Sequence, residues 1–339
     1  MFLLAQHLNL PQPWVILMPR RQVLTFLVRA GLAIMSWGIL SSCFAHKPIN
    51  EPIKSTEDWA KANSAYFVDY DFNRFGVTEP GSKAVGAIEF PSAPVTDSDI
   101  EELAQLKPEV YRLGLPWAKL TDRGSKSLSG IQSLRSLTLA NNTGISDESL
   151  KYFARLKHLR YLDLSINNIS DTGIAKLGEL RYLKRLDLNE TKVKGYGFKG
   201  FDALQELKLS RTPVDSAGLK VISQLKLLNT LELHETKIVD SDLGYLSGMP
   251  EMAGLVLSNT AITDSGVTHL APLAHKLQVL YFDGTKITDA SIKVLSKMKR
   301  LTFLSVIETN ITEKGFETLQ LALPEAKIRS DYGVAEGRK

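Results

Sequence analysis

Apolar residues recur along this chain in a pattern of two halves, L-x-x-L-x-L followed by I-T-D-x-G-I-x-x-L-x-x-L, that repeats about every 24 residues. The first apolar residue of each unit lies at 85, 110, 134, 159, 183, 204, 228, 252, 277 and 301. Self-similarity at a fixed period of this length is typical of a solenoid. The pattern predicts ten tandem units across residues 85–328.

The two halves of a unit have different hydrophobic periods. In the unit that begins at residue 159, Leu162 and Leu164 alternate with polar residues, which predicts a short strand with one face inward. Ile174, Leu177 and Leu180 then recur every three residues, which predicts a short helix or 3-10 turn. We therefore expect an α/β solenoid, curved, with a parallel sheet on its concave side and short helices on its convex side.

A Ser or Thr followed by Asp precedes the helical half in most units, as in Thr263-Asp264. The same pair recurs as Thr96-Asp97, Thr121-Asp122, Ser146-Asp147, Ser170-Asp171 and Thr288-Asp289. The hydroxyl can accept hydrogen bonds from the first turn of a helix, and the carboxylate favours the positive helix end. Near-identical copies indicate a device that turns the chain, rather than a metal or catalytic site.

The unit at residues 183–203 is three residues short and lacks the Asp. It contains Gly195, Gly197 and Gly200 in the spacing G-x-G-x-x-G, but the long helix and doubly wound sheet of a dinucleotide site are missing from the pattern. We expect a glycine-rich loop in place of the helix, with Phe198 and Phe201 filling the core.

The outward residues of the predicted strands lie two, four and six places after the first residue of each unit. In the middle units they form a mixed-charge strip, whereas the units from 252 onward present mainly aliphatic and aromatic residues. Charges on adjacent strands can simply pair with each other, but exposed apolar groups tend to mark contact sites. A buried polar layer or a docked C-terminal tail would also account for the apolar group. The candidate partner-binding residues are Tyr161, Arg185, Lys208, His234, Tyr281, Asp283 and Phe303.

On these repeats the chain resembles the leucine-rich repeat family. The pattern with T-x-I-T-D-x-G-L is similar to a class of exported bacterial repeat proteins common in planctomycetes, and to the repeats of F-box proteins with threonine in place of cysteine. The threonines concerned are Thr191, Thr212, Thr236, Thr260, Thr285 and Thr309. The resemblance covers 85–328 and implies the solenoid fold, while the fold itself hosts many functions.

The N-terminal 43 residues have the order of an export signal: Arg20 and Arg21, an apolar stretch over 30–40, and small residues before Cys43. The segment Leu40 to Cys43 resembles a bacterial lipobox, which implies lipidation of Cys43 and a membrane tether. Ordinary cleavage after residue 45 and a twin-arginine export signal are alternatives. The apolar run is too short for a membrane-spanning helix, which needs about 20 residues. Translation can start at Met1 or at Met18.

The rest of the chain divides into a polar linker at 44–58, an aromatic-rich N-terminal cap at 59–84 and a polar C-terminal tail at 329–339. The formal net charge is +4, and the leader holds three of the excess cations, so the folded part is nearly neutral. Neutrality argues against a nucleic-acid partner.

Motifs of hydrolases, phosphate-binding loops and metal sites are absent from the sequence. His234 is the only histidine after the leader with nearby carboxylates on a predicted outward strand, Glu232 and Glu235, and it lacks a nucleophile. We expect no catalytic residue, cofactor or metal.

The sequence thus favours a non-enzymatic binding module, exported to the periplasm or cell envelope and lipid-anchored there. Its expected partner is a protein, with a cell-wall polymer as a lesser candidate. An adaptor resembling the repeat domain of F-box proteins and an envelope hydrolase are the alternatives.

Overall fold

The computed structural model describes residues 66–68, 87–89, 95–106 and 109–338. The predicted leader with Cys43 and the predicted linker lie outside the described residues, as does most of the predicted cap. None of the helices in the described part of the chain has the length and apolarity that a membrane crossing requires.

The strands form one sheet in which sequential order is also spatial order. They are β1 (Tyr66–Val68), β2 (Ala87–Glu89), β3 (Arg112–Gly114), β4 (Ser136–Thr138), β5 (Tyr161–Asp163), β6 (Arg185–Asp187), β7 (Glu206–Lys208), β8 (Thr230–Glu232), β9 (Gly254–Val256), β10 (Val279–Tyr281), β11 (Phe303–Ser305), β12 (Lys327–Ser330) and β13 (Gly333–Ala335). Neighbouring strands from β2 to β12 are parallel. Each strand from β2 to β11 begins two residues after a predicted unit start, so the predicted register is confirmed.

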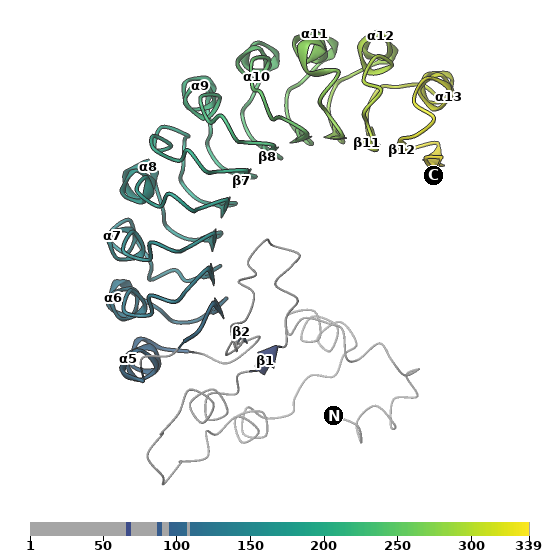
Figure 1. The fold of residues 1–339 in the computed structure, drawn as a ribbon. Coiled ribbons are helices and arrows are strands. Elements are labelled where there is room, and N and C mark those ends of the chain that lie inside the picture. The colour runs from purple at the N-terminus through teal and green to yellow at the C-terminus, as the bar shows by residue number, and fades with distance from the viewer. Residues whose placement is uncertain (1–65, 69–86, 90–94, 107–108, 339) are drawn as a thin grey trace, which may run out of the picture. The chain divides into compact units, whose positions relative to one another are not determined.

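Short helices follow most strands and lie on the outer side of the curved array, with the strands on its inner side (Figure 1). The α-helices are α5 (Asp97–Gln105), α6 (Asp122–Leu128), α7 (Leu150–Phe153), α8 (Asp171–Ile174), α9 (Ser216–Ile222), α10 (Leu243–Leu246), α11 (Asp264–His269), α12 (Ile292–Leu295) and α13 (Glu313–Ala322). The 3-10 turns are Ala175–Leu177, Asp240–Asp242, Ala271–Leu273 and Asp289–Ser291. The predicted α/β solenoid is thereby confirmed.

The core of the solenoid runs between the sheet and the helices as one continuous apolar cluster. In the repeat that begins at 252, Leu255 and Leu257 come from the strand side, and Ile262 and Val267 from the turn and helix, and all are fully buried. Burying an aliphatic side chain contributes about 1.5–3 kcal/mol. A single repeat of 24 residues cannot enclose such a core, so each repeat depends on its neighbours.

The two ends of the described sheet are closed by antiparallel strands: β1 pairs with β2, and β13 pairs with β12. The sequence was expected to become a polar tail at 329, but β12 crosses that boundary and β13 follows it. Ile328 is fully buried and Ala335 packs against the core. The last repeat would otherwise expose its apolar end, which explains why a segment with few apolar residues still joins the sheet.

The repeated Ser/Thr-Asp pairs cap helices as predicted. The hydroxyl of Thr121 accepts a hydrogen bond from the backbone N–H of Arg123, and Thr263 does the same for Ser265. Ser170 and Thr288 cap their helical turns in the same way. The Ser/Thr-Asp pair therefore caps the helix at the point where the chain enters it, so the motif has a structural role.

The aspartate of each pair, and Asp240 after Val239, has a further partner in the next repeat that the sequence reasoning missed. Asp240 accepts hydrogen bonds from Thr263 N (2.8 Å) and Thr263 Oγ1 (2.6 Å), and Asp264 accepts from Thr288 N (2.8 Å) and Thr288 Oγ1 (2.7 Å). The same bridge is made by Asp97, Asp122, Asp147 and Asp289. We call this series the aspartate ladder. It ties successive repeats together along the turn side.

The glycine two residues after the aspartate makes room for this ladder. A Cβ atom at Gly266 would lie 2.4 Å from Oδ1 of Asp240, and one at Gly315 would lie 2.1 Å from Oδ1 of Asp289. A side chain added at either glycine would therefore clash with the bridging carboxylate, whereas Ser149 and Ser291 at equivalent places donate hydrogen bonds to it. The D-x-G spacing of the repeat follows from this close approach.

The short unit at 183–203 has a loop where other units have a helix. Residues 188–205, all of them described, contain no helix, and Phe198 and Phe201 are buried with ring centroids 5.5 Å apart. The glycine-rich loop aims its backbone N–H groups at the carboxylate of Asp171, which accepts from residues 194, 195, 196 and 197 at 2.6–3.0 Å. A protein carboxylate fills the place where a nucleotide-binding loop would hold phosphate.

Candidate functional site

The outward side chains of the strands differ in chemistry from repeat to repeat, and we call the surface they form the strand face. The parallel register places equivalent residues side by side, so Tyr161 stands next to Arg185, and Asp187 stands next to Lys208. Neighbouring strands are about 4.8 Å apart, close enough for side chains to pair across them. The strand face therefore consists of two rows of side chains across the sheet, one from the first residue of each strand and one from the third.

The middle of the strand face is a strip of alternating charges that pair with one another. Arg185 Nε lies 3.3 Å from Glu206 Oε2, and Lys208 Nζ lies 2.9 Å from Glu232 Oε1 and 3.7 Å from Glu206 Oε1. We call these residues the paired strip. Each half-exposed pair contributes about 0.2–1 kcal/mol. The alternative interpretation of these charges, lateral pairing, is confirmed for Arg185 and Lys208.

Two carboxylates, Asp163 and Asp187, lie side by side at the edge of the paired strip. Asp163 accepts hydrogen bonds from Ser165 N and Oγ, at 2.9 and 2.7 Å. Burial raises the pKa of Asp187 to about 6, the backbone N–H of Asn189 partly opposes this, and the neighbouring Asp163 raises it further. Burial likewise raises the pKa of Tyr161. These two adjacent carboxylates repel each other, whereas the charges of the paired strip are matched by opposite charges.

His234 lies just beyond the paired strip, where the chain turns out of β8. Its Nε2 lies 3.0 Å from Glu235 Oε1, and Glu235 is also held by Arg211 at 2.7 Å. Arg211 reaches Glu190 as well, at 3.1 Å. These contacts place His234 beside the ion pairs that Arg211 makes with Glu190 and Glu235. Among the described residues, no group of three His, Cys, Asp or Glu side chains is placed to hold a metal ion.

From β9 to β11 the strand face becomes mainly apolar, and at β12 it returns to cations with Lys327 and Arg329. The rings of Tyr281 and Phe303 pack with centroids 4.9 Å apart and an interplanar angle of 34°. Val279 and Val256 are half-buried beside them. The ring pair and the two valines form what we call the aromatic end. The structure thus brings together two of the predicted partner-binding residues, Tyr281 and Phe303.

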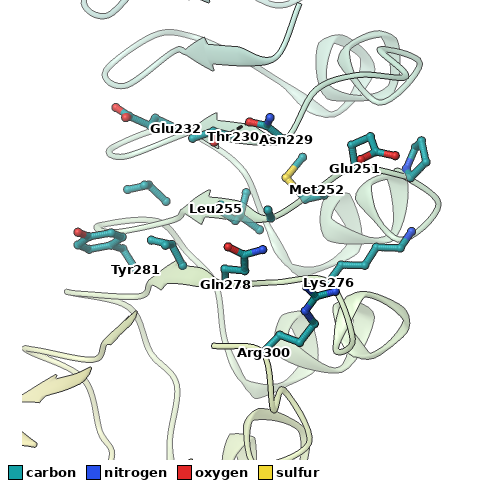
Figure 2. A pocket seen from close by; sticks show the side chains of 15 residues that line it. Asn229, Thr230, Glu232, Glu251, Met252, Leu255, Lys276, Gln278, Tyr281 and Arg300 are labelled. Atoms are coloured by element: carbon teal, nitrogen blue, oxygen red, sulfur yellow. Dashed lines mark hydrogen bonds between the residues drawn. The ribbon is translucent and has the colours of Figure 1, made fainter. Parts of the chain in front are cut away.

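The aromatic end borders an open hollow of about 710 Å³. Figure 2 shows Glu232 and Tyr281 at one end of the strands that line it, and Lys276 and Arg300 at the other. The floor includes Gly254, which stands where other described strands carry side chains such as Arg185 or Thr230. A missing side chain in this row opens the hollow.

The remaining predicted site residues lie elsewhere on the strand face. Tyr161, Arg185 and Lys208 belong to the middle repeats, away from the hollow. Asp283 accepts hydrogen bonds from Ser305 Oγ (2.5 Å) and Ile307 N (2.9 Å), so it holds the turn after β11. The C-terminal residues continue the sheet beyond β11 instead of lying across its face.

Sequence reasoning missed Gly254, Lys276 and Arg300 as parts of a site. A signal for the hollow was present, since Gly254 is a glycine at a strand position where the neighbouring repeats have Thr230 and Val279. The two cations precede their strands and so lay outside the outward positions that were considered.

Comparison with known proteins agrees with this fold. A family model described as Leucine Rich repeat matches residues 130–154 and 155–178. No protein of curated function gave a significant sequence match. Similar solved structures include internalin C2 from Listeria monocytogenes, with 22% identity, TM-score 0.46, and coverage of 60% of this chain and 83% of that one.

Two receptors are also similar to this chain. The plant peptide hormone receptor RGFR1 in complex with RGF2 has 18% identity and TM-score 0.42, and the alignment covers 68% of this chain and 37% of the receptor. The TLR13–ssRNA13 complex has 19% identity and TM-score 0.50, with 70% and 34% covered. The chain thus spans about a third of either receptor. At these identities the likeness concerns the fold alone. The family model and the TLR13 structure support a leucine-rich repeat fold.

Proposed function

We propose that this chain is a non-enzymatic protein-binding module that recognises its partner through the aromatic end of the strand face. The observation that carries the proposal is the contrast within that face. The charges of the paired strip satisfy one another, whereas Tyr281, Phe303, Val256 and Val279 present apolar surface beside an open hollow. Contiguous apolar surface of this kind is typical of contact sites, and aromatic residues often carry much of their binding energy.

The rigidity of the solenoid supports this role. The strand face is backed by a continuous buried core and by the aspartate ladder, so the side chains of the aromatic end are held in place before a partner arrives. Preorganisation of this kind reduces the ordering cost of association. The expected partner is a protein, and a cell-wall polymer remains the lesser candidate.

The location of the module is the second part of the proposal. The leader sequence, with Arg20, Arg21 and the small residues before Cys43, favours export and lipid attachment at Cys43, and the polar linker at 44–58 would act as a tether. The resemblance to exported planctomycete repeat proteins supports the same placement. An adaptor role inside the cell, like that of F-box repeat proteins, would fit the fold but leaves the leader unexplained.

Affinity capture from the envelope of the native cells tests the binding site. The baits are the native chain and the double variant Tyr281→Ala/Phe303→Ala. A protein retained by the native chain and lost by the variant supports the proposal. The matched control is Tyr182→Ala/Tyr245→Ala, which removes two aromatic residues that are exposed outside the strand face, 57% and 40%. Loss of capture with the control, or equal retention by all three chains, would refute it.

Metabolic labelling with a fatty acid tests the anchor. The native chain should incorporate label and partition into the membrane fraction, and Cys43→Ser should do neither. Label that persists in Cys43→Ser, or a native chain found unlabelled in the cytoplasm, would overturn the proposed location and leave the binding site to be judged by capture alone.

A further inference from the structure

We propose that the hollow over Gly254 receives an extended peptide in which a large apolar side chain lies within two residues of an acidic one. The inference rests on the proposed function and names the chemistry of the segment that would be recognised. It is carried by three features of the hollow: its missing side chains, its apolar wall and its cationic rim.

The space comes from one repeat with small outward residues. Ala253, Gly254 and Val256 occupy the positions that carry Asn229, Thr230 and Glu232 in the preceding repeat. In the following repeat the same positions carry Gln278, Val279 and Tyr281. The result is a trough one repeat wide between two walls. With strands about 4.8 Å apart, the walls are separated by about 10 Å, which admits one side chain or one extended backbone.

The walls differ in character. On one side Val279 and Tyr281 present apolar surface, and Tyr281 is held by its packing against Phe303. On the other side Thr230 and Glu232 are polar, and Glu232 is already engaged by Lys208 at 2.9 Å. A large apolar side chain lowered over Gly254 would therefore pack against the valine and the tyrosine.

Two cations, Lys276 and Arg300, stand at the strand-entry end of the trough (Figure 2). They occupy the same position in neighbouring repeats, and Lys276 Nζ donates a hydrogen bond to the carbonyl of Met249 at 3.2 Å. Within the described part of the chain, no carboxylate forms an ion pair with either cation. Glu251 also lies on this rim and is exposed, which leaves the rim with an excess of positive charge. Like charges side by side favour an anionic group between them.

This rim contrasts with the paired strip, where every cation faces a carboxylate on the next strand. On the rim of the trough one carboxylate, Glu251, accompanies two cations, so one positive charge is left without a complement and a ligand carboxylate can supply it. Position 276 precedes position 279 by three residues, or about 10 Å along the strand, and the long side chains of Lys276 and Arg300 shorten that distance. Residues i and i+2 of an extended peptide are about 7 Å apart, so the acidic residue should lie one or two places from the apolar one.

Selection from a random dodecapeptide library displayed on phage, with the full chain as bait, tests the inference. We expect enriched peptides to share an acidic residue within two places of Leu, Phe, Tyr or Trp. A synthetic peptide from this set should bind Lys276→Glu/Arg300→Glu at least tenfold more weakly than the native chain. The control is Arg181→Glu/Lys293→Glu, which reverses two exposed cations away from the trough and should not change Kd.

Two further comparisons keep the result interpretable. Replacing the peptide's acidic residue by its amide should weaken binding to the native chain tenfold and remove the difference between the native chain and the rim variant. Gly254→Leu, which fills the trough, should weaken binding of the same peptide. Enriched peptides that lack the acidic–apolar pair, no enriched peptide, or a rim variant that binds the peptide normally would each overturn the inference.

The failure of this inference is distinguishable from failure of the proposed function. If the partner is still lost from Tyr281→Ala/Phe303→Ala but retained by the rim variant, the aromatic end binds and the trough does not select acidic peptides. If the partner is retained by both variants, the proposed function fails as well.

Discussion

The turn side and the strand face of this solenoid are built from the same repeats but use their polar residues differently. On the turn side, an aspartate in six of the ten units bonds to the Ser or Thr of the next repeat, and a glycine or a serine stands beside its carboxylate. On the strand face, equivalent positions hold Arg185, Thr230, Gly254 and Phe303 in different repeats. A residue that recurs at the same position in successive repeats supports the stack. A residue that differs from its equivalents in neighbouring repeats can serve recognition.

The difference also separates two kinds of carboxylate. In Asp264, burial favours the protonated form, but hydrogen bonds from Ser291 and Thr288 outweigh it and lower the pKa. In Asp187, burial outweighs the single backbone hydrogen bond and raises the pKa to about 6. Folding therefore stabilises the ionised carboxylate of Asp264 in the ladder and destabilises that of Asp187 on the strand face.

The largest expected effect comes from placing a charge in the core beneath the turn. Ile262 is fully buried, so Ile262→Asp should lower the free energy of unfolding by at least about 3 kcal/mol through lost apolar contacts and an unpaired charge. Urea denaturation followed by circular dichroism would measure it. The exposed neighbour gives the control, because Ala261→Asp should change stability by less than about 0.5 kcal/mol. Equal stability of the two variants would show that the repeat register is wrong.

Breaking one rung of the ladder should have a smaller effect. Asp264→Ala removes the acceptor for Thr288 N and Oγ1 and should cost about 1–3 kcal/mol. Because the pKa of Asp264 is lowered on folding, its stabilisation is present above pH 3.8 and is lost as the pH falls below it. The gap between the variant and the native chain should therefore narrow in acid. Asp202→Ala, at an exposed position, is the control, and a gap that is constant with pH would contradict this account.

On the strand face, removing a charge should stabilise the chain. The folded-state pKa of Asp187 is about 6 and its ordinary value is 3.8, so the folded chain binds the proton more tightly and loses stability as the pH rises from about 4 to 6. Asp187→Asn should be more stable than the native chain at pH 7.5 by about 1 kcal/mol, a figure reduced for the partial exposure of the group. At pH 4 or below the difference should vanish. A benefit of equal size at both pH values would argue against the raised pKa.

The smallest effect concerns the turn that follows each strand. Ile166 adopts a left-handed conformation, with φ of 58°, which is unfavourable for a β-branched residue, and Gly284 occupies the equivalent place with φ of 66°. Ile166→Gly should raise stability by about 0.5 kcal/mol, since relief of strain exceeds the added freedom of the unfolded chain. Thermal melting would detect it. Lys192→Gly, at an exposed position without this strain, should instead lower the melting temperature.

Much of the fold could be predicted because the same hydrophobic pattern recurs in each repeat. Leu162 and Leu164, or Leu255 and Leu257, carry the same alternation, so the strand starts were placed correctly from β2 to β11. The glycine-rich loop at 195–200 was also recognised, because Phe198 and Phe201 replace the missing helical residues. Repetition averages out the ambiguity of a single short strand.

The parts that could not be predicted depend on contacts between repeats. The pairing of Asp240 with Thr263 needs the stacking distance, which no single repeat contains. The end of the solenoid was placed too early because β13 is held by backbone hydrogen bonds with few apolar residues, as at Val334, which is exposed. The hollow forms because Gly254 has no side chain between Thr230 and Val279 on the neighbouring strands. A hydrophobic pattern records the apolar residues present and does not reveal such a gap.

Site-specific photo-crosslinking in the native cells tests the central claim most directly. A photoreactive residue would replace Val256 in one chain, beside the hollow, and Glu206 in another, within the paired strip. The account predicts a discrete crosslinked partner from position 256 and none from position 206. A partner crosslinked at 206 and missing at 256 would place recognition on the paired strip and contradict the account.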